Sequence, residues 1–163
     1  MFAVFIVTFP AEAIMGVTAL QAAKHACDTS DWTLTNLQLQ KILYLAHMVY
    51  AGRHKRPMIA DENFQAWNYG PVLPSVYHRA SAFGARPIRN IFRSILCPSD
   101  PLAVELIDEA VDRFGNEPAF KLVKLTHDGK SAWSRHFTTG HWGVEIPFSS
   151  VLDEYAQRFG PKE

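Results

Sequence analysis

Histidine is the first residue type in this sequence that could do chemistry, because its imidazole binds transition metals and titrates near neutral pH. The chain contains seven histidines, but their spacing matches no HExxH helix, and no CxxC pair accompanies them. His136 and His141 would be separated by a turn instead of being aligned on one helix. We therefore expect no metal and no cofactor, and we predict that the histidines lie on the surface or in ordinary hydrogen bonds.

Nucleophilic catalysis would require a serine or cysteine beside a positioned base. Cys27 follows His25 by two residues, and side chains two apart on a helix point in different directions. The GxSxG turn of many serine hydrolases and the glycine loop that holds phosphates are both absent from the sequence. The residues on their own therefore favour a binding protein over an enzyme.

Three arginines, Arg86, Arg89 and Arg93, fall on one face of the helix that we predict over residues 86–96. A row of guanidinium groups can pair with carboxylates on a partner protein, which makes these residues a secondary candidate surface. The other interpretation, a solvated helix face, is the one we favour. The β-branched residues of this segment leave a β-hairpin as the alternative to a helix.

Three aromatic residues, Trp67, Tyr69 and Tyr77, surround a segment that glycine and proline make rigid, residues 70–74. Trp and Tyr are enriched at the positions that contribute most to protein binding, and they also anchor loops onto a core. From the residues alone, core anchoring is the favoured interpretation and a binding surface is the alternative.

The composition restricts the class of partner. Sixteen basic residues balance sixteen acidic ones, so the chain lacks the net positive charge that drives non-specific binding to nucleic acids. The 163 residues are 48% hydrophobic, which suits one domain with its own core, and the two cysteines indicate no disulfide framework. We predict a cytoplasmic protein that does not bind membranes and for which nucleic acid is a poor candidate partner.

Residues 1–14 precede the first helical pattern. Residues 2–9 are apolar except for Thr8, but they lack the basic start of a signal peptide and are too few to span a membrane. We interpret residues 1–14 as a short leader or as the result of a mis-assigned start codon, with translation beginning at Met15.

The strongest helical pattern lies between Leu39 and Tyr50, where apolar residues recur at spacings of three and four around most of the circumference. A helix of this kind is buried, so we predict that it is the central helix of the fold. Thr35 with Gln38 matches a capping box that begins the helix, and Gly52 is its predicted stop.

Weaker patterns predict the remaining elements. Helices are expected over residues 17–26, 74–83, 100–114, 118–125 and 131–136 and from Ser150 to Gly160, with a short strand at 64–67 and irregular structure over 140–147. The predicted fold is mainly α: a single compact helical domain with a central buried helix and a short strand or β-hairpin.

Two blocks of the sequence resemble a known family. They are residues 37–46 (LQLQKILYLA) and residues 66–77, which contain AWNYGPV followed by PSVY. Later in the chain, Leu125-Thr126-His127, Ala132-Trp133 and Ile146-Pro147 resemble further positions of the same family. In order, spacing and residue type these blocks are similar to the SocA-like and phage-associated GepA-like proteins, grouped as the Panacea domain, and the resemblance assigns that domain to residues 15–160.

The resemblance implies an antitoxin that binds and neutralises a cognate protein toxin, and in the SocA type an adaptor that presents the toxin to ClpX, the unfoldase of the ClpXP protease. It also implies that the partner-binding residues are those at the matching positions, namely Lys41, Tyr44, Trp67, Tyr69, Gly70, Pro71, Tyr77, His127 and Trp133. The alternative is a phage-associated helical enzyme or regulator that uses a histidine site.

Overall fold

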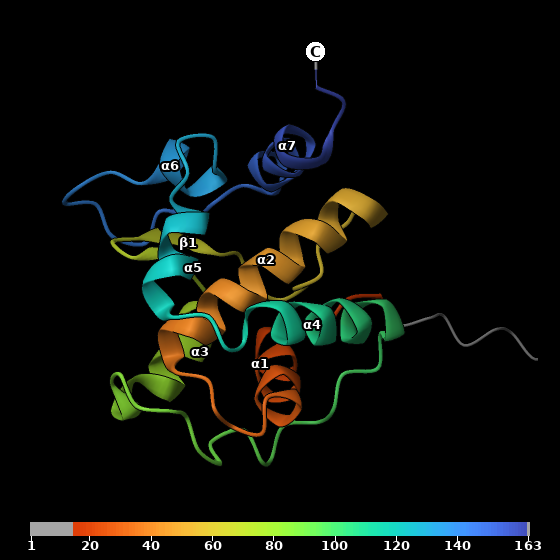
Figure 1. Cartoon of the computed structure of the whole chain (residues 1–163), viewed down its shortest axis with the longest axis vertical. Coiled ribbons are helices and arrows are strands. Elements are labelled where there is room, and N and C mark those ends of the chain that lie inside the picture. The colour runs from red at the N-terminus through yellow and green to blue at the C-terminus, as the bar shows by residue number, and fades with distance from the viewer. Residues whose placement is uncertain (1–14, 163) are drawn as a thin grey trace, which may run out of the picture.

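Helix α2 (Asn36–His54) runs through the middle of the molecule, and most of the other helices pack around it (Figure 1). The computed structural model describes residues 15–162, which form a mainly helical fold with one small antiparallel sheet. The other elements are α1 (Ala19–Thr29), β1 (Gln65–Trp67), β2 (Gly70–Val72), α3 (Pro74–Ala80), the 3-10 turn η1 (Ser81–Phe83), α4 (Pro101–Phe114), α5 (Ala119–Thr126), α6 (Ala132–His136) and α7 (Phe148–Phe159). The predicted fold class, with its buried central helix, is confirmed.

Helix α2 begins at the predicted capping box. The Gln38 backbone N–H donates to Thr35 Oγ1 at 3.3 Å, and the Thr35 N–H donates to the Gln38 side chain at 2.9 Å. Along the helix, Leu39, Ile42 and Leu43 are completely buried. Burial of each such side chain contributes roughly 1.5–3 kcal/mol, so enclosure of α2 is a principal source of the stability of the fold.

The prediction that α2 stops at Gly52 is wrong. The helix continues to His54 and ends at Lys55, whose φ of 56° lies in the left-handed region that closes many helices. Gly52 has a packing role instead: a Cβ atom built there would lie 2.0 Å from Cγ of Tyr155 on α7. The absence of a side chain therefore lets the Tyr155 ring lie directly against the α2 backbone.

Replacing Gly52 with alanine should destabilise the protein, because the added methyl group and the Tyr155 ring cannot occupy the same space. Overpacking of this kind costs roughly 1–3 kcal/mol, which exceeds the gain of up to about 1 kcal/mol from the better helix propensity of alanine. Urea unfolding measures the difference. Gly129→Ala is the matched control, since nothing lies within 4 Å of a Cβ at that position. Equal stability of Gly52→Ala and the parent chain would contradict the close contact.

The segment 86–96 is neither the predicted helix nor the alternative hairpin. It is irregular, with an isolated bridge at Pro87 and a turn at residues 91–94. Asn90 has a φ of 56°, and the Ile88 N–H donates to the Leu34 carbonyl oxygen at 2.9 Å. Both features interrupt a helix, one through a left-handed residue and the other through a tertiary hydrogen bond that replaces a helical one. Ile88 and Phe92 are buried, whereas the three arginines of the segment are exposed and share no helical face.

Helix α7 begins earlier than predicted. Its first residue is Phe148 and its cap is Pro147, so Ser150 lies within the first turn. The Ser150 hydroxyl is not free to cap the helix, because it hydrogen-bonds to Nε2 of His136 at 2.8 Å. The end of the helix at Gly160 is confirmed.

Helix α4 begins at Asp100, as predicted, and this residue also joins three parts of the chain. Its Oδ1 accepts from the Leu102 N–H at 2.9 Å, while its Oδ2 accepts from the Gly16 N–H and from the Tyr50 hydroxyl, both at 2.6 Å. These bonds hold the pKa of the Asp100 carboxyl below its usual value, although burial acts in the opposite direction. The start of α4 is thereby attached to α2.

Within residues 15–162, no helix has the length and apolar character needed to cross a bilayer. The predicted leader or mis-assigned start, residues 1–14, lies outside the described residues. The assignment of residues 15–160 as the functional domain stays a prediction.

Candidate partner-binding site

The β1–β2 hairpin organises most of the residues that the sequence singles out. Gln65 pairs with Val72 and Trp67 with Gly70, so Asn68 and Tyr69 form the connecting turn. Gly70 has a φ of 106°, a conformation that glycine adopts without strain. The hairpin lies against α2, α5 and α6, and its turn carries Tyr69 into solvent with 68% of the side chain exposed.

Lys41 of α2 contacts the hairpin from the core side. Its side chain is completely buried, and its Nζ donates to the Pro71 carbonyl oxygen at 3.0 Å. A Cβ atom at Gly70 would lie 2.9 Å from Lys41 Nζ and 3.0 Å from Thr126 Oγ1, so the hairpin backbone touches both side chains. Burial lowers the pKa of Lys41 to about 7, because the charged ammonium is poorly solvated there.

Two further polar side chains of α2 fix the segment after the hairpin. Gln40 accepts a hydrogen bond from the Leu73 N–H at 2.8 Å and donates to Asn36 Oδ1 at 3.3 Å. Asn36 in turn donates to the Tyr77 carbonyl oxygen at 3.2 Å. Each buried amide replaces its bonds to water with bonds to backbone or side chain, so α2 holds both the hairpin and the start of α3 in place.

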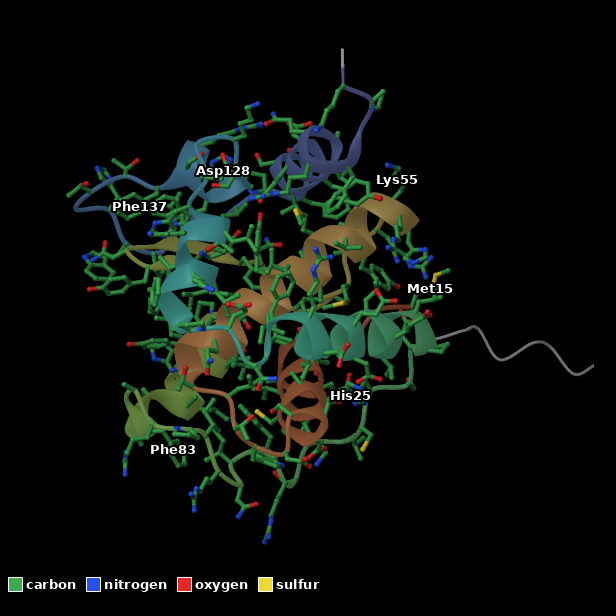
Figure 2. All side chains as sticks on the ribbon, in the orientation of Figure 1. Met15, His25, Lys55, Phe83, Asp128 and Phe137 are labelled. Atoms are coloured by element: carbon green, nitrogen blue, oxygen red, sulfur yellow. The ribbon has the colours of Figure 1, made fainter. Side chains whose placement is uncertain are left out.

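His127 and Trp133 close the other side of the hairpin. The two rings stack at 3.6 Å with an interplanar angle of 3°, and Trp133 Nε1 donates to the Trp67 carbonyl oxygen at 2.7 Å. Phe137 extends the stack at the edge of the molecule (Figure 2). His127 Nε2 is buried and has no hydrogen-bond partner among the described residues. Burial, followed by the nearby charge of Lys41, lowers the His127 pKa, which favours neutral imidazole.

Four aromatic side chains gather on the outside of the hairpin, and we call them the aromatic face: Trp67, Tyr69, Tyr77 and Trp142. The Trp67 ring lies 4.8 Å from Tyr77 and 6.4 Å from Trp142, both edge to face. Trp142 is 76% exposed and Tyr77 37% exposed. Together with Asn36, Gln40 and Val72 they line a groove of about 410 Å³.

Tyr44 lies apart from the hairpin, on the side of α2 that faces α7. Its hydroxyl donates to Glu154 Oε2 at 2.5 Å, and the same oxygen accepts from the Ala132 N–H at 2.9 Å. Arg158 pairs with Glu154 at 2.8 Å. Burial, followed by the Glu154 charge, raises the pKa of Tyr44 well above its usual value. This cluster links α2, α6 and α7 inside the core.

The structure thus brings together most of the predicted site residues but gives them different positions. Trp67, Tyr69 and Tyr77 reach the surface, whereas Lys41 and Tyr44 are fully buried. Trp142 was missed, because a single tryptophan in an irregular glycine-containing loop carries no periodic signal. Its position beside Trp67 depends on a tertiary contact between segments far apart in the chain. Contact of any of these residues with a partner stays a prediction.

Groups suited to catalysis are few in the described part of the chain. Cys27 is buried, and burial raises its pKa to about 12, which disfavours the reactive thiolate. His25 of α1, labelled in Figure 2, hydrogen-bonds through its Nε2 to Asp108 of α4 at 2.7 Å. His47 is buried and its Nδ1 accepts from the Ile59 N–H at 3.2 Å. Over residues 15–162, no three His, Cys, Asp or Glu side chains come together as a metal-binding group would.

The chain belongs to the antitoxin SocA-like, Panacea domain family, whose model matches residues 39–134. It is 34% identical over 113 residues to Antitoxin SocA of Caulobacter vibrioides (strain NA1000 / CB15N), across 63% of this chain. The aligned part spans 60% of the length of that relative. No solved structure matches the chain. The family resemblance read from the sequence is therefore confirmed, and the matched region contains α2 from Leu39, the hairpin and the His127–Trp133 stack.

The burial of Lys41 predicts a pH dependence of stability with a definite sign. The usual lysine pKa of 10.5 falls to about 7 in the folded chain. Between these values the unfolded chain binds more protons, so the free energy of unfolding rises with pH, by up to about 1.4 kcal/mol per unit. Lys41→Met should remove this rise, as measured by urea unfolding at intervals from pH 7 to pH 9. Lys130→Met, at an exposed position, is the control. If the free energy of unfolding rises with pH equally steeply in both variants, the lowered pKa of the buried Lys41 is wrong.

Proposed function

We propose that this protein is an antitoxin that binds a cognate protein toxin directly and neutralises it through the aromatic face. Its membership of the antitoxin SocA-like family supports the antitoxin role. The observation that carries the choice of surface is the exposure of Tyr69 and Trp142 beside a groove, at 68% and 76%. Large aromatic side chains in solvent at a concave site are typical of protein-binding surfaces.

The support beneath the aromatic face favours binding. Lys41, Gln40 and Trp133 each hydrogen-bond to the backbone of the hairpin or of the segment that follows it. A surface held in this way loses little conformational entropy when a partner binds, so more of the contact energy appears as affinity. The toxin would be blocked by occupation of its surface and not by a chemical reaction.

A histidine enzyme is the less favoured reading of the same residues. Within residues 15–162, His127 is the one histidine that combines a lowered pKa with a buried side-chain nitrogen lacking a hydrogen-bond partner. Its Nε2 is buried, and one face of its ring is covered by Trp133 at 3.6 Å. A general base must come within hydrogen-bond distance of a substrate proton. The buried Nε2 of His127 does not do so from within the ring stack. We therefore propose a binding function for the site.

We further propose that the antitoxin acts as an adaptor that presents the bound toxin to ClpX of the ClpXP protease. An adaptor raises the effective concentration of the toxin at the unfoldase, and it must contact both proteins at once. The toxin would bind the aromatic face, and the unfoldase would need a separate surface.

Tyr69→Ala and Trp142→Ala should each abolish rescue of growth when the protein is co-produced with the toxin encoded by the neighbouring gene. Truncation of an anchor residue costs at least about 2 kcal/mol, or roughly thirtyfold in affinity. Because both side chains are mostly in solvent, the melting temperature should stay close to that of the parent chain. The measurements are growth, copurification and the affinity of the purified pair.

Phe120→Ala is the matched control, because Phe120 is also an exposed aromatic residue, at 61%, but lies on α5 outside the groove. It should bind the toxin like the parent chain. Full rescue and unchanged affinity in both Tyr69→Ala and Trp142→Ala would show that the aromatic face is not the toxin-binding surface. Absence of any complex with the parent chain would argue against the antitoxin proposal itself.

Depletion of ClpX should lengthen the half-life of the toxin in cells that contain this protein, as measured by a chase after synthesis is blocked. Depletion of the antitoxin should lengthen it to a similar extent, because the adaptor and the unfoldase act in one step. A half-life that depends on neither protein would leave neutralisation by occlusion alone.

A further inference from the structure

Helices α4 and α7 lie on either side of the C-terminal half of α2 (Figure 1). Each packs extensively against α2, but they make no comparable contact with each other. Between them a groove of about 330 Å³ remains open, with α2 as its floor. This groove is separate from the aromatic face, since none of its lining residues belongs to the hairpin or to the groove beside it.

The floor and walls of this groove are mainly apolar. On α2, Leu45 and Val49 are four residues apart, so they lie on one helical face along the groove. Phe114 of α4 and Tyr155 of α7 form the walls, and Phe159 at the end of α7 is 60% exposed. Leu45 is itself buried, while Val49, Phe114 and Tyr155 are half-buried, so the groove exposes apolar surface at these three side chains, and one further helix would cover it.

The rim of the groove carries positive charge. Arg53, Arg113 and Arg158 come from the last turns of α2, α4 and α7, and Glu109 is the one acidic lining residue among those described. Arg158 is already paired with Glu154. Arg53 and Arg113 are exposed and form no ion pair within residues 15–162. Two guanidinium groups beside an apolar floor match carboxylates on the partner.

We infer that the groove between α4 and α7 is a second docking site, which takes an acidic amphipathic helix of a partner protein. The apolar side of that helix would lie on Val49, Phe114 and Tyr155. Asp or Glu residues beside it would meet Arg53 and Arg113. This inference does not depend on the identity of the toxin. Residues 1–14 of this chain are a poorer match, because they contain a single carboxylate side chain, Glu12.

Two designed helical peptides of about 14 residues provide the test, read by fluorescence anisotropy with the full chain. Both peptides carry a stripe of Leu at i, i+4 and i+7. In one peptide Glu residues lie on both sides of this stripe, and in the other peptide Lys residues do. The Glu peptide should bind at least about tenfold more tightly than the Lys peptide at low salt, and the difference should shrink as salt screens the charges. Equal binding of the two peptides, or preference for the Lys peptide, would overturn the inference.

The Arg53→Glu/Arg113→Glu double variant should reverse the preference, because it changes the rim charge and leaves the floor intact. Arg79→Glu/Lys130→Glu makes the same charge change at exposed positions outside the groove and should leave the preference unaltered. Val49→Asn should weaken both peptides, since it makes the half-buried floor polar. A reversed peptide preference in the control variant, or unchanged peptide binding in Val49→Asn, would show that the peptides bind elsewhere and would overturn the inference.

Other occupants have distinct signatures. Concentration-dependent dimers of the parent chain in analytical ultracentrifugation, abolished by Val49→Asn, would show that a second copy fills the groove and would overturn the inference. Tighter binding of a peptide with the sequence of residues 1–14 than of the Glu peptide would do the same. None of these measurements uses the toxin. A negative result with the peptides therefore does not bear on the antitoxin proposal, and a negative result in toxin binding does not bear on the groove between α4 and α7.

Discussion

The structure depends on one constraint: helix α2 is apolar around nearly its whole circumference and must be kept out of water. The hydrophobic free energy of its side chains is gained only if other elements cover every side. Toward its N-terminal half, α1, α3, α5 and the hairpin provide that cover, and toward its C-terminal half α4 and α7 do so. The cover is close on the hairpin side and less complete at Val49, which is half-buried in the groove between α4 and α7. Both proposed binding surfaces therefore result from how one helix is enclosed.

The hairpin is placed by a polar interaction within this apolar setting. An ammonium group buried without a carboxylate is costly, and Lys41 reduces the cost by donating to the Pro71 carbonyl and by a pKa lowered to about 7. The hairpin backbone then approaches closely at Gly70, where the φ of 106° is strained for other residues and a Cβ atom would lie 2.9 Å from Lys41 Nζ. Tyr69 in the turn extends into solvent while the hairpin backbone is hydrogen-bonded to the core through Lys41 and Trp133.

The sequence was sufficient for features that depend on local order and insufficient for those that depend on distant contacts. Thr35 with Gln38 predicted the start of α2, because a capping box is a local interaction. Gly52 was misread as a stop, since its contact with Tyr155 is more than 100 residues away in sequence. The irregular structure over 86–96 arises from pairing of Ile88 with Leu34. Trp142 was missed for the same reason, so the aromatic face could be predicted only in part.

The two surfaces differ in the kind of recognition they support. Around Trp67 the rings are held edge to face, so the surface is preorganised and binds a partner of complementary shape more tightly. The groove over Val49 is bordered by arginines on flexible side chains, which favours rapid, charge-guided and salt-sensitive association. A protein that holds one partner through shape and meets another through charge can release the second quickly while it retains the first.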